Sequence, residues 1–366
     1  MNFLCLTEHL KYATGIAERF SGKNAALPIL GSILLEQDNH ILKITATNLE
    51  YAIQLEVPGS GSQTERIAVP AKIFSSLMQS FADEKVQLEG KNGHLHIKTE
   101  MRNSRINGLS PDEFPLIPKV EKTYAISMPA IALRAGIEHV APAVSTSEFR
   151  PELGGVYIRV APLAIHFAAT DTFRLAEKTA PLDTKYEGDP FSFILPYRIA
   201  QEIARIADVD GEDVEITVGE NQMHLAMGRI RIMSRTIDGA FPEYYAIIPR
   251  QFETSCFVKK DGLLAGIRAS SIFASKLQDV SLVIGEKTMH INTENESVGE
   301  YKSILACATT GKEVGVNFNY RYLFDGLQQI DEDELFMGLN GGNGPCLLRN
   351  KEDSSFLYVL MPIRLS

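Results

Sequence analysis

The chain has 366 residues, of which 45% are hydrophobic and 22% are charged. These proportions are typical of a globular protein with a sizeable core, and the length predicts two or three domains. The formal net charge of −10 argues against a uniformly basic nucleic-acid-binding protein, but it averages over all faces and allows basic groups on one of them. No apolar run reaches the roughly 20 residues that span a bilayer, and the first residues lack the pattern of a secretory signal. We therefore expect a cytoplasmic protein without a membrane segment.

The four cysteines lie far apart in the sequence, at Cys5, Cys256, Cys307 and Cys346. Their spacing contains no CxxC motif of the kind found in zinc and redox sites. We therefore expect reduced thiols, no metal site and no cofactor.

One pattern occurs three times along the chain. Thr47, Thr170 and Thr293 each end a run of alternating apolar residues, and a polar turn follows each of them. The three threonines are separated by 123 residues in both intervals. Equal spacing of a local pattern is the signature of repeated structural units.

Two further series agree with this interval. Lys72, Arg198 and Arg321 each open an amphipathic stretch, and the segments RINGLSPDEFP and RIMSRTIDGAFP end at Pro115 and Pro242. The spacings of 123 to 127 residues predict three equivalent units. Because prolines suit the connections between domains, we place the domains at 1–121, 122–249 and 250–366.

Each unit is predicted to contain two helices and several strands. Amphipathic periodicity predicts helices at 7–20, 71–81, 129–140, 197–207, 260–275 and 320–330. Alternating apolar residues predict strands at 42–45, 94–98, 156–160, 214–218, 223–227 and 289–292. The predicted class is therefore α+β.

The helix predicted at 71–81 illustrates how polarity is divided. Its apolar face is expected to hold Ile73, Phe74, Leu77, Met78 and Phe81, and its polar face Lys72, Ser75, Ser76 and Gln79. The polar helix faces of all three units lean towards basic residues, although any exposed helix can carry Lys and Arg. Strand edges invite pairing, so such units could close head to tail into a ring that holds a polyanion.

The sequence resembles a known family, the bacterial sliding clamps, which are the beta subunits of DNA polymerase III. The resemblance extends over essentially the whole chain and all three units. The matching segments are LPILGSILLE (27–36), AVPAKIF (68–74), the Gly154–Gly155 pair, ATDTFRLA (169–176), IDGAFPEY (237–244), GVNFNYRYL (315–323) and YVLMPIRL (358–365). Each motif is weak alone, but their order is highly specific.

The resemblance implies three tandem clamp domains, with helices lining the inside of a ring and antiparallel sheets outside. Two protomers would close into a homodimeric ring around double-stranded DNA, and one chain would form half of it. The ring would tether the catalytic subunit of DNA polymerase III to its template. Its other partners would be the clamp loader, other polymerases, and repair and mismatch proteins that carry linear peptide motifs. The chain would be an accessory subunit without catalysis of its own.

The family's peptide-binding pocket lies between the second and third domains. The positions that match it are Leu153, Thr170, Thr172, Arg174, Leu175, Pro242, Ile247, Val359, Leu360, Met361, Pro362, Ile363, Arg364 and Leu365. The apolar members suit a preformed groove, and arginines at its rim could orient a partner.

The sequence departs from the family at the rim of this pocket. Thr172 and Phe173 stand where relatives commonly have Gly-His, and Ala246 stands where many carry a long basic side chain. The apolar ring of Phe173 and the lack of a basic side chain at Ala246 leave the peptide preference undetermined. They do not argue against the pocket itself.

The resemblance also implies contacts to DNA and to the second protomer. The expected phosphate contacts, weak and without base preference, are Lys23 or Asn24, Lys72, Arg150, Arg198 and Arg205. The interface should join the first domain to the third domain of the other protomer, and Ile106 and Ile272 match its apolar positions.

Two other functions stay open at this point. Asp171, beside Thr170 and Arg174 and near His166, could belong to a hydrolase site, but the chain has no HExxH, GxSxG or phosphate-loop motif. The second alternative is a repeat-built scaffold that binds proteins without encircling DNA.

Overall fold

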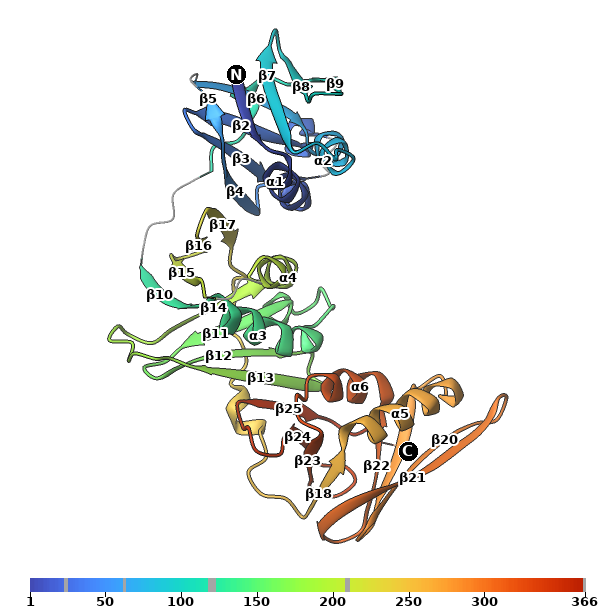
Figure 1. Cartoon of the computed structure of the whole chain (residues 1–366). Coiled ribbons are helices and arrows are strands. Elements are labelled where there is room, and N and C mark those ends of the chain that lie inside the picture. Colours follow the sequence, from blue (N-terminus) through green and yellow to red (C-terminus); the bar gives the residue numbers. More distant parts are fainter. Residues whose placement is uncertain (23–25, 62–63, 118–122, 208–210, 365–366) are drawn as a thin grey trace. The chain divides into compact units, whose positions relative to one another are not determined.

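The computed structural model describes the whole chain except residues 23–25, 62–63, 118–122, 208–210 and 365–366. The chain forms two compact units (Figure 1). Unit 1 comprises Met1–Ala130 and Asp210–Thr236, and unit 2 comprises Ile131–Val209 and Ile237–Ser366. The second sequence repeat therefore contributes to both units, because its strands divide between two sheets.

All six predicted helices are confirmed. They are α1 (Thr7–Phe20), α2 (Ala71–Gln79), α3 (Ala130–Val140), α4 (Tyr197–Ile206), α5 (Lys260–Ser270) and α6 (Tyr320–Gln328). The helix expected at 260–275 is shorter than predicted, since a 3₁₀ turn at Ser271–Phe273 follows α5. The six predicted strands are confirmed as well, each within a strand given below.

Unit 1 contains a five-stranded sheet in the order β5-β1-β7-β8-β9 and an eight-stranded sheet in the order β10-β15-β16-β17-β4-β3-β2-β6. All of the paired strands are antiparallel, and α1 packs on β3, β4 and α2. The strands are β1 (Asn2–Leu6), β2 (Ser32–Asp38), β3 (Ile41–Thr47), β4 (Tyr51–Pro58), β5 (Ser60–Gly61), β6 (Thr64–Pro70), β7 (Lys85–Lys91), β8 (His94–Lys98), β9 (Asn103–Asn107), β10 (Tyr124–Pro129), β15 (Asp213–Val218), β16 (Gln222–Met227) and β17 (Ile230–Arg235).

Unit 2 is built on one antiparallel sheet of twelve strands in the order β14-β11-β12-β13-β25-β24-β23-β18-β21-β20-β19-β22. The strands are β11 (Gly155–Val160), β12 (Ala164–Thr170), β13 (Arg174–Pro181), β14 (Phe191–Pro196), β18 (Thr254–Lys259), β19 (Asp279–Ile284), β20 (Thr288–Asn295), β21 (Gly299–Gly311), β22 (Val314–Asn319), β23 (Glu334–Leu339), β24 (Cys346–Asn350) and β25 (Phe356–Leu360). The junction between its first and second halves is the backbone pairing of β13 with β25.

The buried face of α2 differs from the prediction in two positions. Ile73 was expected in the core but is 57% exposed, whereas Ser75 was expected in solvent but is buried. The helix buries Ala71, Phe74, Ser75 and Met78, which recur three and four residues apart, and Ile73 lies off that stripe. An exposed isoleucine on a short helix leaves apolar surface that this chain does not cover.

The four cysteines are free thiols, as the sequence predicts. Cys5, Cys256 and Cys346 are buried, and burial raises the pKa of both Cys5 and Cys256 to about 12. These thiols are protonated at neutral pH and therefore unreactive.

The contact between α3 and the sheet provides a test of the fold. A Cβ atom on Gly136 would overlap the ring of Phe167 on β12, and Phe167 is fully buried. We expect Gly136→Ala to lower the free energy of unfolding by about 1–3 kcal/mol, because overpacking outweighs the gain in helix propensity. Gly15→Ala in α1 is the matched control, since its Cβ would meet only the flexible amide of Gln79. Equal stability of the two variants in denaturant titrations would contradict the packing.

Candidate functional site: the pocket of unit 2

The turn between β12 and β13 carries the Thr-Asp-Thr sequence of the predicted pocket. The Thr170 hydroxyl donates to the carbonyl of Arg174 at 2.6 Å and accepts the amide of Thr172 at 3.2 Å. The Asp171 Oδ1 atom accepts the amides of Phe173 and Arg174, both at 3.0 Å. Thr172 consequently takes a left-handed backbone conformation with φ of 79°. Thr172 and Phe173 are thus held outward, and the Phe173 ring is 60% exposed.

Arg174 is a bridge between two parts of unit 2. Its guanidinium pairs with Asp171 Oδ2 at 2.9 Å and with Asp325 Oδ2 on α6 at 2.5 Å. It also lies 4.2 Å from the ring centre of Tyr322 and donates to the Tyr358 hydroxyl at 3.4 Å. Only 10% of its side chain is exposed. Arg174 is therefore held inside the junction, where the two carboxylates neutralise its charge, and its role towards a partner peptide stays a prediction.

Strand β25 carries two of the predicted pocket positions, Val359 and Leu360. It pairs with β13 in the register Leu175 opposite Val359, and both side chains are buried. After β25 the Met361 amide donates to the carbonyl of Phe173 at 2.9 Å, which directs the last residues past the turn. Met361 is 39% exposed, and Arg364 is also exposed. The predicted residue Leu365 lies outside the described residues.

The segment that follows Phe241 packs against one face of the same sheet. Tyr244 is buried, and its hydroxyl donates a hydrogen bond to the buried carboxylate of Glu177 on β13. Burial raises the pKa of Glu177 above its ordinary value, although the Tyr244 hydroxyl favours the charged form. The aromatic rings of Phe241, Tyr244 and Tyr245 pack beside Tyr157. This packing fixes the connecting segment against the sheet.

The predicted pocket residues therefore fall into two groups. Leu153, Thr170, Leu175, Val359 and Leu360 are buried. Those at the surface are Thr172, Ile247, Met361 and Arg364, with Pro242, Pro362 and Ile363 half-buried. Ile247 is 55% exposed on the connecting segment. Buried apolar residues next to exposed Phe173 and Met361 suit an apolar peptide side chain, and Ile247 stays a predicted member of the pocket.

The hydrolase alternative has no support in this geometry. The carboxylate of Asp171 is occupied by two backbone amides and by Arg174. His166 contacts the Thr179 hydroxyl at 3.2 Å, and burial followed by the charge of Arg159 lowers the pKa of His166. The groups do not converge on a common point, as a catalytic site requires.

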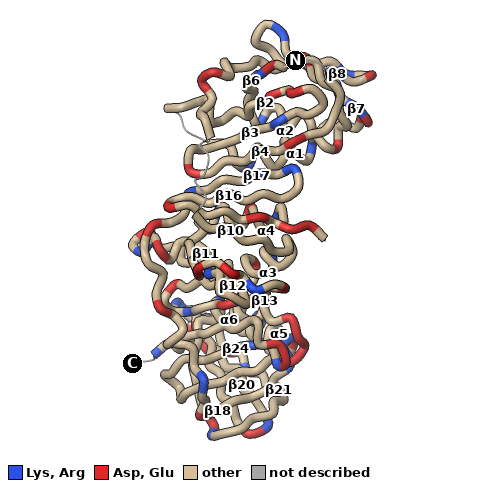
Figure 2. Tube along the Cα trace, turned by 90° about the vertical axis from the view of Figure 1, so that its left-hand side faces the viewer, with Lys and Arg blue, Asp and Glu red and all other residues tan. Residues whose placement is uncertain are grey.

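The predicted DNA-contact residues lie on helix surfaces and loops. Lys72, Arg150, Arg198 and Arg205 are exposed, while Lys23 and Asn24 lie outside the described residues. Two of these arginines have acidic neighbours: Arg150 pairs with Glu152 at 2.9 Å, and Arg205 pairs with Glu202 at 2.8 Å. Acidic and basic positions are interspersed along the chain (Figure 2). These residues therefore do not form a continuous basic stripe. Isolated basic side chains among acidic ones are suited to weak contacts with phosphates.

The predicted interface residues differ in exposure. Ile272 is 71% exposed, whereas Ile106 on β9 is only 6% exposed and packs inside its own domain. Strand β9 is nonetheless the last strand of the five-stranded sheet. Residue 106 can thus contribute to an interface through the edge of its strand more than through its side chain.

Family models match the chain in three consecutive segments. The N-terminal, central and C-terminal domains of the DNA polymerase III beta subunit match residues 1–118, 127–243 and 245–364. The chain belongs to the DNA polymerase III beta subunit family. The resemblance found in the sequence is thereby confirmed, and so is the α+β fold of three tandem clamp domains.

Individual relatives agree along their whole length. The beta sliding clamp of Synechocystis is 28% identical, with all of both chains covered. The solved DNA polymerase III beta subunit of Thermotoga maritima is 25% identical and superimposes with a TM-score of 0.93 over both entire chains. A Pseudomonas aeruginosa sliding clamp solved bound to griselimycin shares the fold with a TM-score of 0.96, at 22% identity over both entire chains.

Two further findings concern the described part of this beta subunit. It contains no helix that is both long and apolar enough to cross a membrane. It also contains no group of three His, Cys, Asp or Glu side chains that could hold a metal ion.

The buried Tyr244–Glu177 contact leads to a pH-dependent prediction. Because the folded-state pKa of Glu177 is raised, its contribution to stability is present at low pH and is lost as pH rises through that pKa. We expect Tyr244→Phe to lower the free energy of unfolding by about 1–3 kcal/mol at about pH 8 and by less at about pH 4, where the carboxyl is protonated. Glu177→Gln should flatten the decline of stability with pH, whereas Glu187→Gln, at an exposed position, should not. Denaturant titrations at both pH values test this, and a Tyr244→Phe cost that is independent of pH would contradict it.

Proposed function

We propose that this chain is a DNA sliding clamp, in which two copies close head to tail into a ring around double-stranded DNA. The observation that carries the proposal is a junction that recurs along the chain. In the first two repeats, the strand after the repeated threonine pairs with the last strand of the following domain. The domain bounds we propose remain 1–121, 122–249 and 250–366.

The first two junctions have the same register. In unit 1, Ala52 on β4 lies opposite Met233 on β17. In unit 2, Leu175 on β13 lies opposite Val359 on β25. Ala52 and Leu175 each lie opposite the repeated threonine in their own hairpin, Thr47 and Thr170. The two junctions are therefore equivalent residue by residue.

The third repeat leaves this junction open. Residues 299–306 of β21 pair with β20, and among the described strands they have no partner on the other side. Strand β9, the last strand of the first domain, is likewise an edge in unit 1. The unpaired edge of β21 in the third domain and the unpaired edge of β9 in the first domain support pairing of β21 with β9 of a second copy. Two such pairings close a ring of six domains.

Large apolar side chains are exposed in both the third and the first domain. Ile272, Leu277 and Ile304 of the third domain are 71%, 61% and 62% exposed. Ile73, on the helix of the first domain, is 57% exposed. Tyr322 occupies the position equivalent to Ile73 in the third repeat, since each follows the repeated basic residue, and there it packs on Arg174 across the junction. The exposure of Ile73 is thus consistent with a junction completed by another chain.

The ring accounts for how this acidic chain holds DNA. A topological link resists dissociation without strong phosphate contacts, which would pin the ring and make it steeply sensitive to salt. Lys72, Arg150, Arg198 and Arg205 then serve as weak contacts without base preference. Polymerase, clamp loader and repair proteins dock by linear motifs at the pocket of unit 2. The chain supplies no chemistry of its own, and it acts in the cytoplasm on the bacterial chromosome.

Removal of the ring interface is the first test. We expect the double variant Ile272→Glu, Ile304→Glu to weaken dimerisation at least about a hundredfold, because a charge would be buried without a partner. Sedimentation at micromolar concentration should give the 40.5 kDa chain for the variant and twice that mass for the parent. Leu163→Glu, at an exposed apolar residue of the second domain, is the control and should stay dimeric. A parent that is monomeric at all concentrations would contradict the ring.

Topology separates the clamp from a scaffold that does not encircle DNA. A ring loaded onto a closed DNA circle by a clamp loader should remain bound at about 0.5 M salt, where phosphate contacts are screened. Cutting the circle once should release it within the time needed to slide off an end. Gel filtration of labelled protein before and after the cut measures this. Release at the same rate from intact and cut circles would contradict encirclement of DNA and would favour a protein-binding scaffold.

A further inference from the structure

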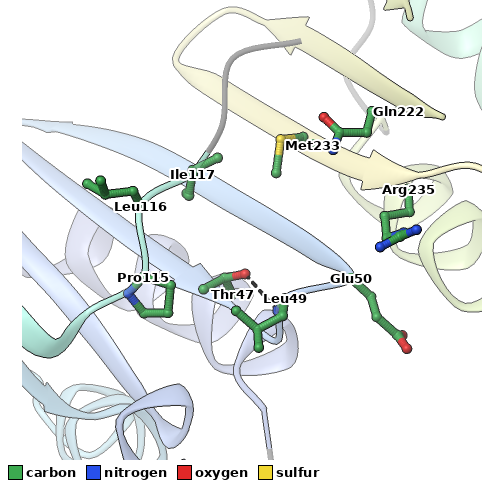
Figure 3. A pocket seen from close by; sticks show the side chains of 9 residues that line it. All are labelled: Thr47, Leu49, Glu50, Pro115, Leu116, Ile117, Gln222, Met233 and Arg235. Atoms are coloured by element: carbon green, nitrogen blue, oxygen red, sulfur yellow. Dashed lines mark hydrogen bonds between the residues drawn. The ribbon is translucent and has the colours of Figure 1, made fainter. Parts of the chain in front are cut away.

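Unit 1 contains a groove at its own domain junction, with a volume of about 100 Å³ (Figure 3). One wall is the β3–β4 turn with Thr47 and Leu49, and the opposite wall is the end of β17 with Met233 and Arg235. The segment that follows Phe114 crosses between them and contributes Leu116, beside Pro115 and Ile117. All of these residues belong to unit 1.

This groove has the same backbone frame as the pocket of unit 2. The Thr47 hydroxyl accepts the amide of Leu49 at 3.0 Å and donates to a carbonyl four residues on, as Thr170 does. Leu49 has a φ of 78°, against 79° for Thr172.

The end of the last strand is anchored identically in the two places. The Arg235 amide donates to the carbonyl of Glu50 at 2.9 Å, and the Met361 amide donates to the carbonyl of Phe173 at 2.9 Å. The groove is therefore the counterpart of the peptide pocket, one domain earlier in the chain.

The side chains give this second groove a chemistry of its own. Leu116 is 92% exposed and Leu49 is 53% exposed, so neither is used by the core of unit 1. In Figure 3, Ile117 and Met233 face each other across the groove. These four side chains offer an apolar surface that can enclose one large apolar residue.

The charged residues of the lining indicate which charge the ligand carries. Arg235 is exposed at the mouth of the groove, and its guanidinium makes no ion pair with the described residues. Glu50 is the other charged residue of the lining, and its carboxylate points away from Met233 and Ile117 (Figure 3). A carboxylate beside the apolar residue would therefore find a partner in Arg235.

We propose that this groove binds a linear peptide of a partner protein that carries an acidic residue next to large apolar residues. The site is distinct from the pocket of unit 2 and would let one chain hold two peptides at once. Its occupant differs in charge preference, because Arg235 replaces the neutral Met361 at the equivalent position. The proposal goes beyond the clamp function, since it concerns a second docking site and not the ring.

The experiment uses the full-length dimer and two fluorescein-labelled hexapeptides, GDLLFG and its charge-reversed partner GKLLFG. Ile247→Glu is introduced first to disable the pocket of unit 2. We expect this variant to bind GDLLFG at one site per chain, measured by fluorescence anisotropy and calorimetry. Adding Leu116→Glu should weaken binding at least about tenfold. Leu116 is so exposed that its replacement leaves the fold intact.

Reversal of the charge at position 235 is the more specific test of the proposal. In the Ile247→Glu background, Arg235→Glu should make GKLLFG bind more tightly than GDLLFG, the reverse of the parent preference. Arg231→Glu, on the same strand but directed at the carbonyls of Gly228 and Ile230, is the matched control and should leave the preference unchanged. Retention of the same variants on a closed DNA circle is measured in parallel. This distinguishes a loss of ring function from a loss of peptide binding in the groove.

Two outcomes would overturn the proposal. The first is that Ile247→Glu alone abolishes all binding of GDLLFG, so that each chain has a single peptide site. The second is that Leu116→Glu leaves peptide binding intact but removes assemblies larger than the dimer in sedimentation, which would make the groove a contact between copies of the chain.

Discussion

The structure depends on one constraint: the strand that follows each repeated threonine must find hydrogen-bond partners in another domain. Unpaired amides and carbonyls along a strand are costly or prone to uncontrolled association. In unit 1 this requirement joins β4 to β17, and in unit 2 it joins β13 to β25. Continuous sheets thus run across domain boundaries, and the domains are held by backbone pairing whose register is fixed. Such pairing limits bending between neighbouring domains, which suits a ring that must hold a polymerase on DNA.

The junction in unit 2 combines this pairing with buried polar groups. Arg174 is neutralised by Asp171 and Asp325, which come from two domains, and Glu177 is held by Tyr244 from the connecting segment. Removal of one partner from such a pair leaves an unpaired charge, so the contacts specify one arrangement even where they add little net stability. The buried residues of the predicted pocket, such as Leu175 and Val359, belong to the core of this junction. The exposed members of the pocket can then vary with the partner peptide.

The repeats, helices and strands could be predicted from the sequence, because apolar periodicity reflects each element's own buried face. The division of the pocket residues into buried and exposed ones could not. Arg174 looks like a surface residue in ATDTFRLA, and its partner Asp325 lies 151 residues further along the chain. The sequence predicts Ile73 in the core, because an apolar side chain that packs on another chain follows the same periodicity as one that packs in the core. The sequence does not predict the groove in unit 1, although Thr47 belongs to the repeat, because only the fold brings Met233 and Leu116 to it.

The third repeat departs from the other two in a way that suits its position. Thr293 lies opposite Tyr301, whereas Thr47 and Thr170 lie opposite residues five positions on, so the third hairpin is longer. The Thr293 hydroxyl is buried without a hydrogen-bond partner among the described residues, while the other two threonines fasten their turns. Between two copies of the chain there is also no connecting segment to raise the effective concentration of the paired edges. The contact between chains is therefore the joint that opens most readily, and a ring that must be placed around an unbroken duplex needs one such joint.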